Sequence, residues 1–590
     1  MTTKYSTNDI SVVLKNIFMS TASYDNVAAE FHAFHKNDFN VFLHLLTTGL
    51  GVWGAVQLAI ICEMHILVGL YAVLVLVSTP WVTGIIHSAL ILGMSLIQVA
   101  PVSDVKSCLI SVAAGYILQD VAHYVCAEKT YLGSYIFTKP FTLVGHTFWL
   151  LPLVLDAVFM RKLFLPWFVT VDRTVVTVVK CKDSVTGLRN WIAKNIAETK
   201  ETTHVWPHES KETSKYSTDL ENDENITAAF RKIFNENNFD LKPVTGMNEI
   251  YVTAVGAKRE INSDAVFYTP HTDGPYWFLP QASLYRVLVG LTPNQMVKTN
   301  FNLQHDSRDK VIDVNDCLGF DYSRELHWIN HTDKKNEERR SVLKLHYVVY
   351  PKGWHRYGAL AAHLNTSYNT WARSNFLYTL RPEGLHQHIT AWWIWLTTWF
   401  NAMFILHFGW ENLVYISFAA ALGYKPFLYL TSFRHYITYI TTFGIRDRPV
   451  AFGQFIRDVK LYKTLALCHL AYIMYPHVDI SRDIMGLVGT MIGFGITVIA
   501  TVKLGFERTY FGMELGFCKP KWIEGFPYGY IPHPMIVGQL IALSVVLVWW
   551  NNIIDMKDQI FIFTHMSFYA VHMMQEEFYS SYYSTSKKID

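Results

Sequence analysis

SLYRVLVGL (283–291) and SVLKLHYVVY (341–350) are the two stretches that decide the fold of the central part of the chain. Both alternate apolar residues with others and are rich in β-branched and aromatic side chains, a pattern typical of strands in a buried sheet. Turns rich in Asn, Asp and Gly separate them from other short strand-like segments. We therefore expect a soluble, β-rich domain over 226–358.

Long apolar segments lie on both sides of this range. Of the 590 residues, 51% are hydrophobic and 17% are charged, a balance too apolar for an ordinary soluble enzyme. We expect two α-helical multi-pass membrane domains, at 24–165 and 384–580, and membrane lipids as partners. The apolar runs lie at 41–62, 65–81, 83–101, 107–125 and 141–160, and at 389–407, 412–431, 463–476, 483–504, 535–550 and 559–575.

Charge and cysteine content exclude other classes of protein. The net charge of +2 comes without a long basic block, so nucleic acid is not an expected partner. The seven cysteines show no paired spacing, which speaks against a zinc site or a disulfide framework. The polar range 190–225 is expected to be a linker. Basic loops near the apolar runs predict a cytosolic middle domain and C-terminus, and Lys587 and Lys588 resemble the dilysine signal of endoplasmic-reticulum membrane proteins.

The segment Pro270-His271-Thr272-Asp273-Gly274 contains a His-x-Asp pair, and His327 follows 56 residues after His271. Two imidazoles and one carboxylate form the facial triad that holds Fe(II) and leaves positions open. Arg340, at the start of the strand 341–350, supplies a guanidinium that can bind a carboxylate through two hydrogen bonds. The alternative is a β-domain in which His-x-Asp stabilises a turn and His327 lies on the surface.

The order and spacing of these four residues resemble those of the 2-oxoglutarate-dependent dioxygenases, and the resemblance covers 245–350. The sequence Gly319-Phe320-Asp321 before His327 is similar to the aspartyl/asparaginyl hydroxylase branch. This resemblance implies a double-stranded β-helix (jelly roll), iron bound by the triad, molecular oxygen as a reactant, and 2-oxoglutarate held by Arg340 or the adjacent Arg339. The branch includes enzymes that hydroxylate lipids as well as enzymes that hydroxylate protein side chains.

In the last third, Gly493-Phe-Gly495 lies in the apolar run 483–504, and Glu576-Glu577 ends the last apolar run. With Phe526-Pro-Tyr528 and Pro534-Met535 between them, these elements resemble the phosphatidylethanolamine N-methyltransferases over about 480–580. The resemblance implies that the two glycines and the two glutamates bind S-adenosylmethionine and that the acceptor is an aminophospholipid. The alternative is that the glycines serve helix packing. No catalytic residue is assigned, because His533, His565 and His572 are more typical of interfacial or packing positions than of a base.

The first apolar region carries an unusual number of histidines. His35, Asn40, His44, His123 and Glu128 resemble the motifs of the endoplasmic-reticulum iron-dependent dioxygenases that shorten 2-hydroxy fatty acids by α-oxidation. The resemblance covers 24–160 and implies that His35, His44 and His123 bind iron. Asp156 stands where that family carries a glutamate.

Together these features predict a multifunctional lipid-modifying membrane enzyme, with S-adenosylmethionine, Fe(II) and 2-oxoglutarate as cofactors. Its activities would be N-methylation, 2-oxoglutarate-dependent hydroxylation and a fatty-acid α-oxidation module. Two alternatives remain: a membrane-anchored hydroxylase of protein side chains, and a membrane scaffold without catalysis.

Overall fold

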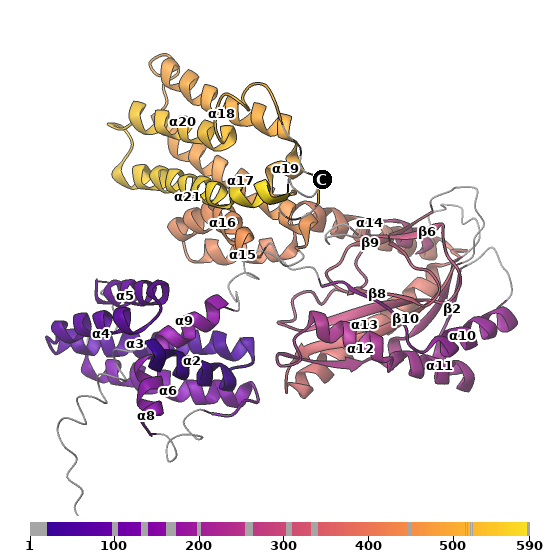
Figure 1. Ribbon diagram of the computed structural model, residues 1–590. Coiled ribbons are helices and arrows are strands. Elements are labelled where there is room, and N and C mark those ends of the chain that lie inside the picture. Colours follow the sequence, from indigo (N-terminus) through magenta and orange to yellow (C-terminus); the bar gives the residue numbers. More distant parts are fainter. Residues whose placement is uncertain are drawn as a thin grey trace, which may run out of the picture.

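The computed structural model describes residues 21–96, 104–130, 140–160, 173–196, 202–253, 263–301, 310–331, 340–445 and 450–586, apart from 514, 516, 520 and 522. The protein is mostly helical, and along the chain a β-sheet region follows one helical lobe and precedes another (Figure 1). We call these parts the N-terminal lobe (21–160), the middle lobe (173–379) and the C-terminal lobe (385–586).

The N-terminal lobe is built from helices only. α3 (Asp38–Ile61) packs along α6 (Val105–Val125), and glycines at their crossing bring the backbones close together. A Cβ added at Gly115 would lie 2.7 Å from the backbone of Gly51. The remaining helices are α2 (Thr21–Phe34), α4 (His65–Ser78), α5 (Trp81–Leu96), α8 (Pro140–Phe148) and α9 (Leu150–Met160).

The middle lobe contains a seven-stranded antiparallel sheet in the order β1-β8-β5-β10-β4-β2, with β3 beside β10. A second sheet, in the order β7-β6-β9, has three strands, and the described strands do not close into a barrel. The strands are β1 (Val175–Val178), β2 (Thr203–Val205), β3 (Phe239–Pro243), β4 (Glu249–Val252), β5 (Ser283–Gly290), β6 (Val297–Phe301), β7 (Lys310–Val311), β8 (Asp316–Asp321), β9 (His327–His331) and β10 (Ser341–Pro351). The β-rich domain expected around β5 and β10 is present, with an open rather than a closed arrangement.

At the two central strands, β5 and β10, helices cover one face of the sheet and charged side chains lie on the other. Val287 on β5 and Leu343 on β10 pack in the core formed with the helices, and the residues adjacent to them, Arg286 and Lys344, line a cavity on the opposite face. Successive side chains of a strand point to opposite faces. Both strands are buried on both faces, so apolar residues also occupy some of the positions between the alternating ones.

The prediction of a linker at 190–225 is wrong. This range contains the end of α10 (Lys182–Asn195), β2 and all of α11 (Lys211–Glu221), and α12 (Glu224–Ile233) follows. Leu220 is fully buried in the sheet core. Composition alone missed these helices because each buries only a narrow apolar stripe and leaves a polar face in water. The lobe also extends beyond 358, since α13 (His355–Thr379) packs against β10.

The C-terminal lobe is a helical bundle. Its helices are α14 (Leu385–His407), α15 (Trp410–Ala421), α16 (Tyr424–Ile445), α17 (Phe452–Met474), α18 (Ile484–Leu504), the short α19 (Phe506–Thr509), α20 (Pro534–Trp549) and α21 (Met556–Ser586). α18 and α20 make the closest pair. At the start of α18, Asp483 accepts hydrogen bonds from the indole N–H groups of Trp549 and Trp550. These bonds connect the start of α18 to the end of α20.

Within the described residues, four helices are long and apolar enough to cross a membrane by length and composition: α3, α6, α14 and α18. Helices α4, α9 and α20 are apolar but shorter. The chain is therefore compatible with a membrane protein, as its composition predicts. The dilysine pair at 587 and 588 lies outside the described residues.

Candidate metal and co-substrate site

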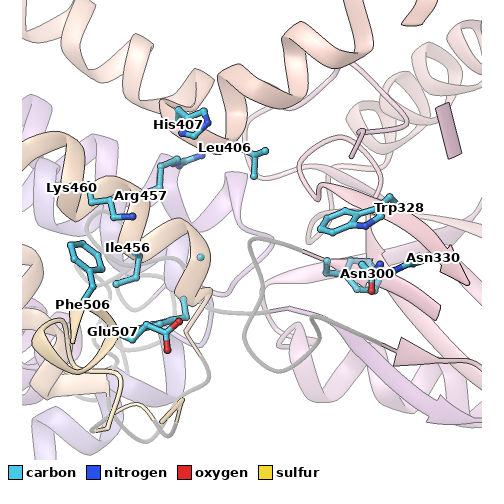
Figure 2. A pocket seen from close by; sticks show the side chains of 13 residues that line it. Asn300, Trp328, Asn330, Leu406, His407, Ile456, Arg457, Lys460, Phe506 and Glu507 are labelled. Atoms are coloured by element: carbon cyan, nitrogen blue, oxygen red, sulfur yellow. The ribbon is translucent and has the colours of Figure 1, made fainter. Parts of the chain in front are cut away.

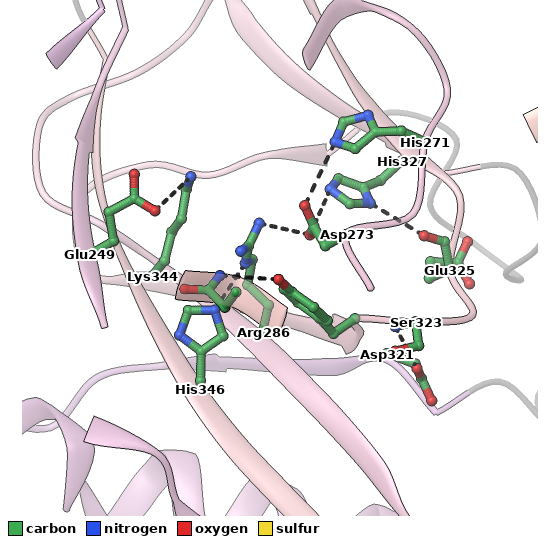
Figure 3. Close-up of polar contacts among 12 residues, drawn as sticks. Glu249, His271, Asp273, Arg286, Asp321, Ser323, Glu325, His327, Lys344 and His346 are labelled. Atoms are coloured by element: carbon green, nitrogen blue, oxygen red, sulfur yellow. Dashed lines mark hydrogen bonds and ion pairs between the residues drawn. The ribbon is translucent and has the colours of Figure 1, made fainter. Parts of the chain in front are cut away.

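His271, Asp273 and His327 lie together in the middle lobe, with one ligand atom of each within 4.8 Å of the others. The backbones of His271 and His327 pair through two hydrogen bonds of 3.1 and 3.0 Å, which sets their rings side by side. Asp273 Oδ2 lies 3.3 Å from His327 Nε2, and its Oδ1 lies 3.8 Å from His271 Nε2 (Figure 3). The structure thus brings together three residues that the sequence separates by up to 56 positions.

The two imidazoles are oriented as metal ligands require. His271 Nδ1 lies 2.8 Å from the carbonyl oxygen of Thr269, and His327 Nδ1 lies 3.2 Å from that of Glu325. A ring that donates through Nδ1 has its lone pair on Nε2. His271 Nε2 is buried and makes no hydrogen bond. Burial lowers the pKa of His271 to about 3, so the ring is neutral at physiological pH.

Arg286 holds the carboxylate of the triad. Its Nη1 donates to Asp273 Oδ2 over 2.7 Å, and its Nε lies 3.1 Å from His346 Nε2. Burial alone would raise the pKa of Asp273, but the guanidinium and the two imidazoles hold it well below its usual range. The sequence analysis missed Arg286, although a charged residue inside the apolar run 283–291 is a signal that this position faces a polar cavity.

Arg340 lines the same cavity. It is 2% exposed, its Nη2 donates to Thr299 Oγ1 over 3.2 Å, and its Nε has no hydrogen-bond partner among the described residues. Burial lowers its pKa to about 10. A buried guanidinium with unused donors is a site for an anion. Arg339, the alternative from the sequence, lies outside the described residues.

A second buried cation, Lys344, also lines this cavity but is already paired. Its Nζ lies 3.3 Å from Glu249 Oε2 and 4.3 Å from the centre of the Tyr251 ring. Glu249 also contacts His204 Nδ1. Arg286 and Lys344 are thus each paired with a carboxylate. Arg340, the third cation of the cavity, donates instead to a hydroxyl.

The segment Gly319-Phe320-Asp321 supports the position of His327. Phe320 packs against His327, with ring centres 4.4 Å apart. Asp321 accepts from the backbone N–H groups of Ser323 and Arg324 and from the Arg324 side chain, which shapes the turn that leads to His327. Phe320 also lines the cavity, whereas Gly319 and Asp321 are not among its lining residues.

The histidines of the N-terminal lobe form a second cluster. Ligand atoms of His35, His44 and His123 lie within 4.8 Å of one another, and all three residues are buried. Their ring centres are 4.5 to 4.8 Å apart. Asn40 bridges this cluster to Glu128, with its Nδ2 3.1 Å from His123 Nδ1 and 2.7 Å from Glu128 Oε2.

Two acidic residues of this lobe have structural partners. Glu128 Oε1 accepts from the backbone N–H groups of Lys36 and Asn37, over 2.6 and 2.9 Å, and so fixes the loop that carries His35. Asp156 accepts from the hydroxyls of Tyr24 and Thr83. Asp156 therefore ties three helices together, and its carboxylate is not among the ligand atoms of the cluster.

In the C-terminal lobe the two glycines of Gly493-Phe-Gly495 face different surroundings. A Cβ at Gly493 would lie 2.5 Å from the backbone nitrogen of Ala542 on α20, whereas a Cβ at Gly495 would meet nothing within 4 Å. Gly493 therefore allows α18 and α20 to touch, as the packing alternative expects. Glu576 and Glu577 lie on α21, but their side chains are outside the described part of the chain. Binding of S-adenosylmethionine by these four residues stays a prediction.

Comparisons with known proteins add little to this geometry. No family model and no curated protein matches the sequence. Among solved structures, the chain is similar to the non-haem α-ketoglutarate-dependent epimerase SnoN from nogalamycin biosynthesis, at 12% identity and a TM-score of 0.21, over 34% of this chain and 89% of that chain. SnoN in complex with Fe3+, α-ketoglutarate and nogalamycin RO matches at 14% identity, a TM-score of 0.21 and coverages of 34% and 90%. At this level the likeness carries no argument, so the function is argued from the site.

Proposed function

We propose that the middle lobe is a mononuclear Fe(II) oxygenase that consumes 2-oxoglutarate. The observation that carries this proposal is a cavity lined by His271, His327 and the incompletely bonded guanidinium of Arg340, with Asp273 beside the two imidazoles. Two imidazoles and one carboxylate suit Fe(II) and leave positions for a bidentate co-substrate. 2-Oxoglutarate carries a second carboxylate, which supplies the anion that Arg340 lacks.

Each of these residues has a distinct role. His271, Asp273 and His327 would hold the metal, and Arg286 keeps Asp273 ionised and oriented. Arg340 would bind the far carboxylate of 2-oxoglutarate. When bound, the metal and co-substrate supply the oxidation, in which 2-oxoglutarate, O2 and a C–H bond become succinate, CO2 and an alcohol. The apolar wall formed by Phe267, Leu288 and Ile329 excludes water from the cavity.

A membrane lipid is the substrate class that we propose for this lobe. α14, one of the four apolar helices, reaches the metal-binding loop, because Asn401 Nδ2 lies 3.2 Å from Oγ1 of Thr272, between two of the proposed ligands. Large apolar residues are exposed along the same helix, among them Trp393 (65%) and Phe400 (60%). In water this apolar surface of α14 would stay exposed, whereas a bilayer would cover it.

The direct test is incubation of the full chain in lipid nanodiscs with Fe(II), 2-oxoglutarate and O2. We expect succinate and a lipid that gains one oxygen atom. Asp273→Ala should lose both products, whereas Glu236→Ala, at an exposed carboxylate that does not line the cavity, should keep both. Succinate with oxygen added to a protein side chain instead of a lipid would favour the protein-hydroxylase alternative. Absence of 2-oxoglutarate turnover by a correctly folded, iron-loaded protein would contradict the proposal.

We propose a second metal-dependent oxidation in the N-terminal lobe, on the cluster His35, His44 and His123. Three buried imidazoles this close together are suitable ligands for iron. Following the sequence resemblance, its substrate would be a 2-hydroxy fatty acid. Iron content of the separate variants His271→Ala and His123→Ala tests this: each should lose about half of the bound iron, and full retention in His123→Ala would contradict a second site.

A further inference from the structure

A crevice of about 800 Å³ lies between the middle and C-terminal lobes (Figure 2). On one side it is lined by β6 and β9, and on the other by the end of α14, the first turns of α17 and α19. It is distinct from the metal cavity. His327 and Ile329 face the metal cavity, and the alternating residues Trp328 and Asn330 face the crevice.

The cationic part of the crevice comes from one face of α17. Arg457 and Lys460, three residues apart, both line it. Arg457 is fully engaged: it donates to the carbonyl of Ile405 over 2.8 Å and pairs with Asp458 and Glu411. Lys460 has no carboxylate within ion-pair distance among the described residues, and its Nζ rests over the Phe506 ring at 4.4 Å. Lys460 is therefore the cation available to a ligand.

The rest of the lining is mainly apolar and aromatic. Figure 2 shows Trp328 across the crevice from Ile456 and Phe506, with Lys460 and His407 on the same side as these two and Glu507 at the lower edge. An amphiphile with an anionic head matches this arrangement, because its head can pair with Lys460 while its chain contacts the apolar wall. The Glu507 carboxylate would direct the anion toward Lys460.

Two of the four apolar helices end at this crevice. His407 is the last residue of α14, and Phe506 follows closely after Leu504, the last residue of α18. If both helices cross a membrane, the crevice lies where the hydrocarbon region ends and the phosphate groups of the lipids begin. A ligand from the bilayer can therefore enter it without leaving the membrane surface.

We propose that the crevice binds a membrane phospholipid, with the phosphate at Lys460 and an acyl chain along Phe452, Ile456 and Phe506. This inference rests on the proposed membrane placement of the C-terminal lobe. The bound lipid would connect the two lobes and hold the middle lobe, with its metal cavity, against the bilayer.

The test uses the full chain in nanodiscs that contain a phospholipid with a photoreactive diazirine in one acyl chain. Cross-linked peptides are mapped by mass spectrometry, and dihexanoyl phosphatidylglycerol and inorganic phosphate serve as competitors. The variant is Lys460→Glu. The matched control is Lys557→Glu, an exposed lysine at the start of α21, at the opposite end of the bundle.

We expect adducts on the peptides that contain Phe452–Lys460 and Phe506, and a roughly 10-fold lower yield for Lys460→Glu, the loss typical of one charge-assisted hydrogen bond. Lys557→Glu should match the parent protein. The short-chain lipid should compete and inorganic phosphate should not. Adducts confined to other helices, or competition by inorganic phosphate alone, would overturn the inference. Failure of the protein to enter nanodiscs would refute the membrane placement instead.

Discussion

Substitution of Arg340 by methionine separates a ligand-binding role from a structural one. Arg340 is buried, and burial lowers its pKa to about 10, which marks its charge as unfavourable in this environment. Methionine has a similar length and no charge. We therefore expect Arg340→Met to leave the free energy of unfolding unchanged or to raise it, because a buried charge without a carboxylate partner is removed.

The same substitution should strongly weaken binding of 2-oxoglutarate. Loss of hydrogen bonds to a carboxylate costs about 1.5–3 kcal/mol, or roughly 10- to 150-fold in Kd. The assay is an anaerobic titration of the Fe(II)-loaded chain with 2-oxoglutarate, followed by the visible metal-to-ligand charge-transfer band, beside urea unfolding of the apoprotein. Lys344→Met is the matched control, since it removes a paired cation from the same cavity. A Kd unchanged in Arg340→Met, together with a loss of stability, would refute the reasoning.

Three further predictions follow from the same cavity and from the C-terminal bundle. Arg286→Met should destabilise the apoprotein by about 3–5 kcal/mol in chemical denaturation, because it leaves Asp273 buried without its cation; a loss below about 1 kcal/mol would contradict that role. Lys344 and His204 hold the pKa of Glu249 below its usual value although burial alone would raise it, so this carboxylate stabilises the fold above about pH 4 and the contribution is lost as the pH falls. Glu249→Gln should therefore lower the melting temperature at pH 7 and flatten its decrease toward acid, and an unchanged profile would argue against the pairing. Gly493→Ala should cost about 1–3 kcal/mol through overpacking against α20, while Gly495→Ala should be nearly neutral in thermal unfolding; equal effects would contradict the asymmetry.

The sequence predicted the central strands correctly because they depend on a local pattern, and it singled out three residues that the structure brings together, while metal binding by them stays a prediction. Alternation over 283–291 and 341–350 identifies β5 and β10, and His-x-Asp with a later histidine is a compact chemical signature. The pattern did not predict which side chains of these strands face the helix-covered core and which face the cavity, because both faces of the strands are buried. Arg286 and Lys344 were therefore missed, although each interrupts an apolar run.

Longer-range packing accounts for the remaining differences. The helices at 211–221 and 224–233 are polar in composition and become stable only through Leu220 and Phe230 against the sheet. Likewise, the sequence around Gly493 does not indicate that this residue packs against α20, which begins more than 40 residues later. Of the double-stranded β-helix expected from the family resemblance, the described strands show two separate sheets that do not close into a barrel.

The central claim is that one iron and one 2-oxoglutarate bind together in the middle lobe. The most direct measurement is the charge-transfer band of the anaerobic full chain with Fe(II) and 2-oxoglutarate, recorded for the parent protein, His271→Ala and His123→Ala. We predict that the band is present in the parent and in His123→Ala and absent in His271→Ala. A band that survives His271→Ala, or one that disappears with His123→Ala alone, would contradict the claim.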